Sequence, residues 1–203
     1  MFRFFGGYAI GFFMPSYFGN VYKDDKKLYA GLNAFIVSFC GFVSSLCGGL
    51  ISDKLEKQGN YYAKAQVCIA AAALGLPCIA LCCLVQSSFY FSICMLGLEY
   101  LVAECWFGPA ITMVLNTIKP ENKGFAVGGF LFCTTIAGTI ATVLAQYFTN
   151  AFDAKNNVEV YGQILVVFVF ISYAGSIPFF ILAGREYKKF MVLKKLEEEQ
   201  NDF

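Results

Sequence analysis

Two carboxylates lie inside a long apolar run, LGLEYLVAECWFGPA, which extends from Leu96 to Ala110. They belong to Glu99 and Glu104, five positions apart, so that on a helix their side chains point about 140° away from each other. An ionised carboxylate in mid-bilayer costs about 2.5 kcal/mol or more, and such groups face the bundle interior or a water-filled cavity. Glu104 is therefore our candidate for a substrate or proton site, and Glu99 is slightly better suited to interhelical bonding.

The two carboxylates have no basic residue near them in the sequence. Arg3 and Lys64 are expected at the edges of their apolar runs, and no other Lys or Arg lies deep in one. A proton, a substrate cation or a second protein unit is therefore expected to compensate the acids. Trp106, close to Glu104, either packs against other helices or lines a site for an amphipathic ligand.

Other chemistries find little support in the sequence. The chain has no His, no GxSxG-type elbow and no metal-ligand spacing, which argues against an enzyme, a metal centre or a cofactor. Its nine Cys lie in apolar runs, which favours free buried thiols over disulfides. A net charge of +1 offers no field for nucleic acid.

The composition is that of a membrane protein. Of 203 residues, 58% are hydrophobic and 14% charged, and the mean hydropathy is +0.61. A membrane-crossing helix needs roughly 20 mostly apolar residues. Six runs meet this length: Phe4–Tyr22, Leu28–Ile51, Ala65–Val85, Phe89–Ile118, Phe125–Phe148 and Gly162–Ala183. The sequence therefore predicts an all-α, polytopic membrane protein.

The loops of this six-span topology alternate in charge. One side collects eleven basic residues and the other four. The positive-inside bias then places both termini in the cytoplasm. We predict a six-helix transmembrane domain over residues 1–183 and a cytoplasmic tail over 184–203, which either continues the last helix into water or lies against lipid headgroups.

Small and polar residues mark helix faces. Gly7 and Gly11 have the spacing of close helix packing, as has a stripe of small residues in the fifth span that runs from Gly129 to Ala145. A second face of that span carries Thr135 and Thr139. Their hydroxyls either bond back to the preceding helical turn or line a wet cavity.

Two stretches resemble the major facilitator superfamily. GGLISDKLEKQG (Gly48–Gly59) is similar to its signature loop, although Glu56 stands where the family usually has Gly. The stretch from Glu104 to Phe132 resembles the tenth-to-eleventh helix region of spinster-like transporters, in which an acid, Trp, Gly-Pro, an amide residue, Pro and a basic-small pair recur in this order. The opening helix, GYAIGFFMPSYF, resembles the family's seventh.

This resemblance implies the C-terminal half of a twelve-helix fold, built of two inverted three-helix repeats, residues 1–85 and 86–183. The missing partner would be an N-terminal six-helix half or a second copy of the chain; the chain starts almost directly in a helix, as a truncated gene model would. Membrane lipids surround it, and its substrate would be a small organic or lipid-like solute. Candidates for the cavity beside Glu104 and Glu99 are Trp106, Asn116, Thr135, Thr139, Tyr8 and Asn33. Candidates for a cytoplasmic gate are Gly49, Asp53, Lys54 and Lys57.

Three functions follow, in order of support. The first is solute transport by alternating access, with proton coupling through Glu104. The second is a non-transporting membrane subunit, or a truncated half-transporter that only packs against a partner. The third, an intramembrane enzyme, has little support because the two glutamates point apart rather than forming a dyad.

Overall fold

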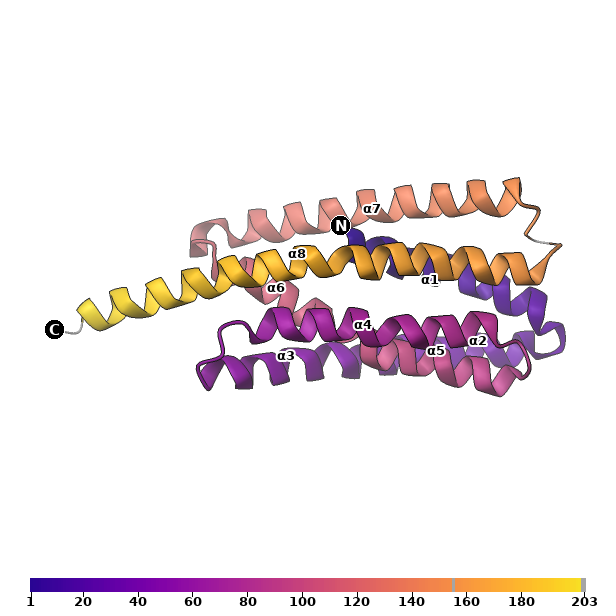
Figure 1. The fold of residues 1–203 in the computed structure, drawn as a ribbon, viewed down its shortest axis with the longest axis horizontal. Helices are drawn as coiled ribbons and strands as arrows, with labels where there is room; N and C mark the ends of the chain where they lie inside the picture. The colour runs from indigo at the N-terminus through magenta and orange to yellow at the C-terminus, as the bar shows by residue number, and fades with distance from the viewer. Residues whose placement is uncertain (155, 202–203) are drawn as a thin grey trace.

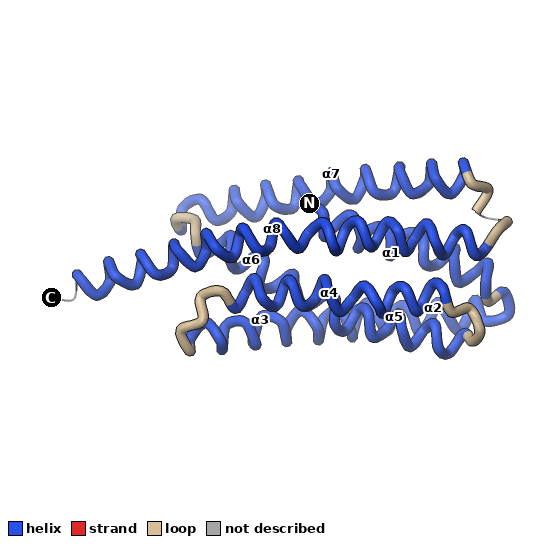
Figure 2. The backbone as a smooth tube through the Cα atoms, viewed as in Figure 1, coloured by secondary structure: helices blue, strands red, loops and turns tan. Residues whose placement is uncertain are grey.

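The computed structural model describes residues 1–154 and 156–201, and helices make up almost all of them (Figures 1 and 2). The described residues contain no strand. The α-helices are α1 (Phe2–Val21), α2 (Lys26–Phe35), α3 (Gly41–Lys57), α4 (Ala63–Leu84), α5 (Phe89–Ala103), α6 (Phe107–Asn116), α7 (Lys123–Ala151) and α8 (Val158–Asn201). Four shorter helical segments join some of them: η1 (Lys23–Asp25), the π-helical η2 (Ile36–Cys40), η3 (Glu104–Trp106) and η4 (Pro120–Asn122).

Several of these segments combine into long rods. Five rods are long and apolar enough to cross a membrane: Lys23–Lys57, Ala63–Leu84, Phe89–Asn116, Pro120–Ala151 and Val158–Gln200. The remaining predicted span is the first one along the chain, α1. Its 20 residues include several Gly and Tyr as well as Arg3, and these lower its hydropathy. The chain is thus an all-helical, multi-pass integral membrane protein with five to six apolar helices.

The break between α5 and α6 has a local cause. Pro109 lacks the N–H that would bond the carbonyl oxygen of Cys105, so regular α-helical bonding fails there. The chain passes through one 3₁₀ turn, η3, and this turn carries Glu104 and Trp106. In contrast, Pro15, Pro77 and Pro178 lie inside continuous helices.

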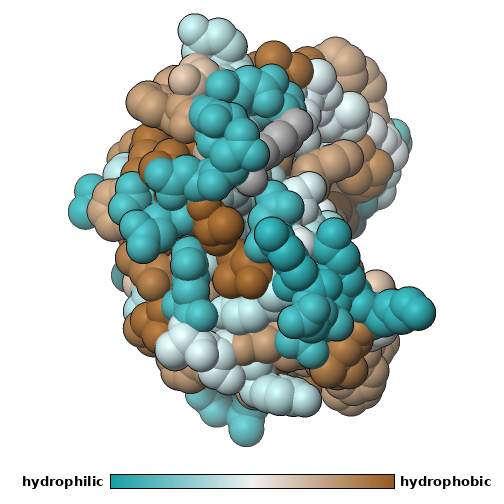
Figure 3. Space-filling model, turned by 90° about the vertical axis from the view of Figure 1, so that its right-hand side faces the viewer, coloured by the Kyte–Doolittle hydropathy of each residue, from teal (hydrophilic) through white to brown (hydrophobic). Residues whose placement is uncertain are grey.

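The helices form a bundle with two distinct ends. We call one the α1–α2 end, where α1 meets α2, α4 meets α5 and α7 meets α8, and the other the α3–α4 end (Figure 1). Seen from the α1–α2 end, hydrophilic residues gather beside apolar ones (Figure 3). Beyond the α3–α4 end, α8 continues as one helix to Asn201, so the predicted tail begins as an extension of that helix.

Glycines set the closest helix contacts, although not all the expected ones. A Cβ at Gly6 would lie 2.7 Å from Ser172 Oγ, and one at Gly138 would lie 2.7 Å from the ring of Tyr8. Gly7 and Gly11 have open space beside them, so the packing role predicted for them is wrong. In α7 the small stripe is buried from Ala137 to Ala145.

The start of α1 lies beside the middle of α8 rather than at an end of the bundle (Figure 1). From there α1 packs between α7 and α8 and runs to the α1–α2 end. The first residues of the chain therefore lie at the same position along the bundle axis as η3, which separates α5 from α6 near the middle of their rod.

Candidate functional site

Arg3 lies in the middle of the bundle and not at its edge, which corrects the sequence-based expectation. Its side chain is 2% exposed, donates a hydrogen bond of 2.7 Å from Nη2 to the carbonyl oxygen of Ala103, and forms an ion pair of 3.4 Å with Glu104 Oε1. The guanidinium also stacks on Tyr173, 3.6 Å from the ring centroid. The expectation that no base of this chain compensates the acids is therefore wrong.

Glu99 is the more deeply buried of the two acids. Its side chain is 1% exposed, whereas that of Glu104 is 29% exposed. Tyr173, from the middle of α8, donates its hydroxyl hydrogen to Glu99 Oε1. Tyr173 thus contacts both Glu99 and Arg3, and one positive group faces two acidic ones. A single proton on either carboxyl would balance the cluster.

Several polar atoms of this cluster have no hydrogen-bond partner among the described residues. They are Nε and Nη1 of Arg3, Oε2 of Glu99 and Nε1 of Trp106. Buried polar atoms in native proteins are normally bonded, so such exceptions call for an explanation. Arg3, Glu99 and Trp106, to which these four atoms belong, can therefore each bond a further donor or acceptor.

The cluster borders a cavity of about 440 Å³. Arg3, Glu99, Glu104 and Trp106 line it, together with Tyr8 and Tyr100. Gly7 and Gly11 form part of the same wall, which explains the open space beside them. Aromatic rings, including Phe4 packed edge-on against Trp106 at 4.8 Å, make the rest of the lining largely apolar.

The other predicted lining residues lie elsewhere. Asn33 borders two cavities closer to the α1–α2 end. Thr135 and Thr139 are exposed on α7, and their hydroxyls bond back to the carbonyl oxygens of Leu131 and Thr135, at 3.1 and 3.0 Å. Asn116 lies at the α3–α4 end, where it donates a hydrogen bond of 2.8 Å to Tyr187 Oη.

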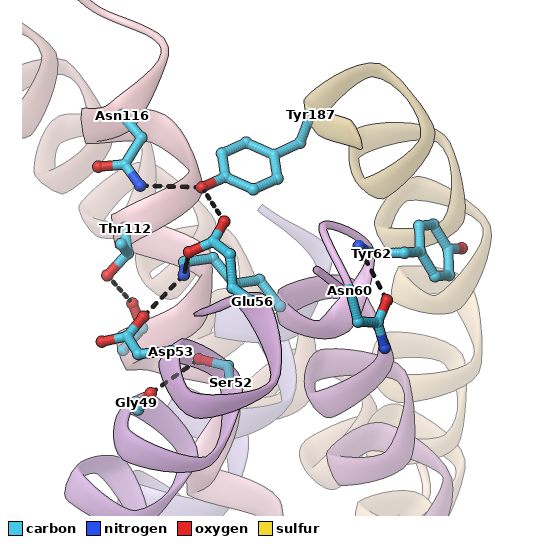
Figure 4. Close-up of polar contacts among 11 residues, drawn as sticks. Gly49, Ser52, Asp53, Glu56, Asn60, Tyr62, Thr112, Asn116 and Tyr187 are labelled. Carbon is cyan, nitrogen blue, oxygen red and sulfur yellow. Dashed lines mark hydrogen bonds and ion pairs between the residues drawn. The ribbon is translucent and has the colours of Figure 1, made fainter. Parts of the chain in front are cut away.

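A second polar cluster, at the α3–α4 end, joins α3, α4, α6 and α8 (Figure 4). At its centre, Lys64 is 1% exposed and forms ion pairs with Asp53, at 2.7 Å, and with Glu56. Tyr187 donates its hydroxyl hydrogen to Glu56 Oε1 at 2.6 Å and accepts the hydrogen bond from Asn116. These five residues, which we call the Lys64 cluster, connect the ends of α3, α4 and α6 with α8.

The predicted gate residues divide between this cluster and the surface. Asp53 belongs to the cluster, but Lys54 and Lys57 are exposed and form no ion pair within the described chain. Gly49 lies against α6, since its Cα is 3.6 Å from a Cβ placed at Gly108, but a Cβ at Gly49 itself would meet nothing within 4 Å. The base that pairs with Asp53 is Lys64. Glu56, which stands where the major facilitator signature loop usually has Gly, is the second partner of Lys64.

The sequence contained a weak signal for Lys64. It stands between Ala63 and Ala65 at the start of an apolar run, and all three residues are buried at the start of α4. No comparable signal marks Tyr173 or Tyr187, because their partners lie 74 and 131 positions away in the sequence.

The helices and the mid-bundle cluster define a multi-pass membrane protein with a buried ion pair beside a cavity. Over 173 residues the chain is 27% identical to the probable galactarate/D-glucarate transporter GudP of Bacillus subtilis (strain 168). The match covers 85% of this chain and 36% of that protein, so the chain spans about a third of the length of its relative. No family model matches the sequence. No solved structure matches it either. This distant similarity supports a membrane transporter in general.

Proposed function

We propose that the chain forms the C-terminal six-helix half of a secondary transporter of the major facilitator type, spinster-like in its α5–α7 region, that moves a small organic solute by alternating access. The observation that carries this proposal is the Arg3–Glu104 ion pair with Glu99 and Tyr173, which lines a cavity in mid-bundle. Ionisable residues at membrane depth mark substrate or ion pathways.

The chemistry of the cavity favours a solute that carries a carboxylate. Nε and Nη1 of Arg3 have no partner in the described chain, and a guanidinium forms strong, charge-assisted hydrogen bonds with carboxylates. Glu104 is the more exposed acid and can give up its place at Arg3 to a substrate carboxylate. The rings of Tyr8, Trp106 and Phe107 would contact the less polar parts of the solute. The relative's name, which specifies two sugar diacids, makes such acids the first compounds to test.

Proton coupling follows from the same exchange. When a substrate carboxylate displaces Glu104 from Arg3, an ionised Glu104 would remain at membrane depth without a partner. Taking up a proton removes that cost. In this scheme residues 1–85 and 86–183 are two inverted repeats, and a second six-helix unit, or a second copy of the chain, closes the cavity. Rocking between the two units then exposes the site to either side of the membrane.

Uptake of radiolabelled galactarate into proteoliposomes that contain the chain tests the proposal. We expect uptake that an inward proton gradient stimulates, and a loss of about tenfold or more in Arg3→Gln, since one charge-assisted hydrogen bond is worth roughly 1.5–3 kcal/mol. Glu104→Gln should transport without responding to the gradient. Glu121→Gln, which changes an exposed acid at the α3–α4 end, is the matched control and should behave as the parent chain.

The alternative, a membrane subunit that does not transport, predicts a different result. A folded parent chain and a folded Glu104→Gln variant would then both show zero uptake of galactarate and D-glucarate. An unchanged response to the proton gradient in Glu104→Gln would remove proton coupling through this residue while leaving transport itself in place.

A further inference from the structure

Three cavities follow one another from the middle of the bundle to its α1–α2 end. The mid-bundle cavity shares Ile10, Gly11 and Tyr100 with a second cavity of about 330 Å³. That cavity in turn shares Pro15, Tyr29 and Asn33 with a third, of about 660 Å³. These shared lining residues place the second cavity between the other two.

The lining changes character along this series. Apolar and aromatic residues dominate around Arg3, and the only ionisable groups there besides tyrosine are Arg3, Glu99 and Glu104. In the third cavity three polar side chains project from α1 and α2 and form no hydrogen bond within the described chain: Asn20, Lys26 and Asn33. Ser16, which bonds the Tyr161 hydroxyl, lines the same cavity. Among the described residues, Lys26 is the only charged one that lines this third cavity.

Lys26 lies at the crossing of α2 with α1. Its Cε is 3.2 Å from a Cβ placed at Gly19, so its side chain lies across the face of α1. It forms no ion pair with any described residue, and neither Asp24 nor Asp25 lines the cavity. Its neighbour Lys27 is equally exposed and lines none of the three cavities.

We propose that this third cavity is a separate binding site for small anions, with Lys26 as its charged group and Asn20, Asn33 and Ser16 as its hydrogen-bonding groups, and that the second cavity connects it to Arg3. A single uncompensated positive charge in a recess concentrates anions there and repels cations. The amides and the hydroxyl then offer both donors and acceptors to a carboxylate-bearing, hydroxyl-rich solute. The identity of that solute rests on the proposed function, but the charge and accessibility of the site do not.

Thiol labelling with charged reagents tests the site without a known substrate. We would introduce Asn33→Cys between the second and third cavities and Gly11→Cys between the first and second, where a Cβ meets nothing within 4 Å. The chain in lipid nanodiscs would react with anionic methanethiosulfonate ethylsulfonate or with its cationic trimethylammonium analogue, and mass spectrometry would follow each cysteine. Cys47 and Cys133, exposed on the bundle but outside these cavities, serve as internal references.

We expect both introduced cysteines to react faster than the two references. We also expect the ratio of anionic to cationic labelling at Asn33→Cys to fall about three- to tenfold when Lys26→Gln is added, because one elementary charge at close range acts oppositely on the two reagents. Lys27→Gln should leave the ratio unchanged, and Lys26→Arg should preserve it.

Two results would overturn the proposal. If Gly11→Cys reacts no faster than Cys133, the cavities do not form an aqueous path to Arg3. If Asn33→Cys reacts but its ratio of anionic to cationic labelling is the same with and without Lys26→Gln, the third cavity has no preference for anions. A chain that fails to take up galactarate but shows the expected labelling would contradict the proposed transport function alone.

Discussion

Two basic residues are buried in the described part of the chain, each beside two acids and a tyrosine, and they differ in how completely they are bonded. In the Lys64 cluster, Nζ contacts both carboxylates, and Tyr187 connects Glu56 with Asn116. No buried side-chain nitrogen or oxygen of that cluster lacks a partner among the residues described. Around Arg3, by contrast, four buried atoms of three residues have no partner, and the group borders a cavity.

This difference separates a structural role from a binding role. A polar network with every group bonded holds its helices rigidly, whereas a partly bonded one carries a cost in the absence of another partner. The Lys64 cluster is therefore expected to hold the ends of α3, α4 and α6 against α8 as one unit. The Arg3 cluster keeps bonding capacity that a solute or a proton can use.

The largest expected effect is a loss of stability in Lys64→Met. Removing the base leaves two carboxylates without a counter-ion, and breaking a buried ion pair costs roughly 3–5 kcal/mol. Because Asp53 is 52% exposed and keeps part of its hydration, we expect about 3 kcal/mol, measured as the free energy of unfolding in mixed micelles. Lys54→Met changes an exposed lysine at the same end of the bundle. Its free energy of unfolding should stay within about 0.5 kcal/mol of that of the parent chain.

The matched change in the other cluster, Arg3→Met, should cost less stability than Lys64→Met. Glu104 is 29% exposed and can take up a proton when its partner is removed, and two unbonded nitrogen atoms are lost with the guanidinium. Equal losses in the two variants would show that the Arg3 cluster is as structural as the Lys64 cluster.

A smaller effect is expected for Tyr187→Phe. The change removes the hydroxyl that donates to Glu56 and accepts from Asn116, while the ring keeps its packing. A hydrogen bond to a charged group is worth about 1.5–3 kcal/mol, and we expect the lower part of that range because Glu56 keeps Lys64. The same unfolding measurement applies, with Tyr90→Phe as a control because Tyr90 is 67% exposed. A loss as small as that of the control would remove Tyr187 from the network.

The sequence predicted what depends on neighbouring residues. Runs of apolar residues located the spans. The two acids were recognised because they interrupt an apolar run. In each case the cause and the structural result lie within a few residues of each other.

The pairing of charges could not be predicted in the same way. Arg3 meets Glu104 across 101 positions of sequence, and its depth depends on where α1 begins relative to α5 and α8. The hydropathy of Arg3 or Glu104 does not indicate where α1 begins relative to α5 and α8. Lys54, adjacent to Asp53 in sequence, points outward on the helix, whereas Lys64 reaches Asp53 because α4 packs against α3.

The smallest effect is expected from changes at Thr135 and Thr139. These changes test whether polarity alone identifies the residues that line a cavity. Both hydroxyls bond to carbonyl oxygens of their own helix one turn earlier, and both side chains are exposed outside the mid-bundle cavity. Such bonds compete with no interhelical contact, so replacing the hydroxyl by a methyl group costs little. The double variant Thr135→Val/Thr139→Val should therefore unfold within about 0.5 kcal/mol of the parent chain and keep its galactarate uptake. A severalfold loss of uptake at unchanged stability would mean that this face of α7 contacts the solute in another state of the transport cycle, and that the Arg3 cavity is only part of the site.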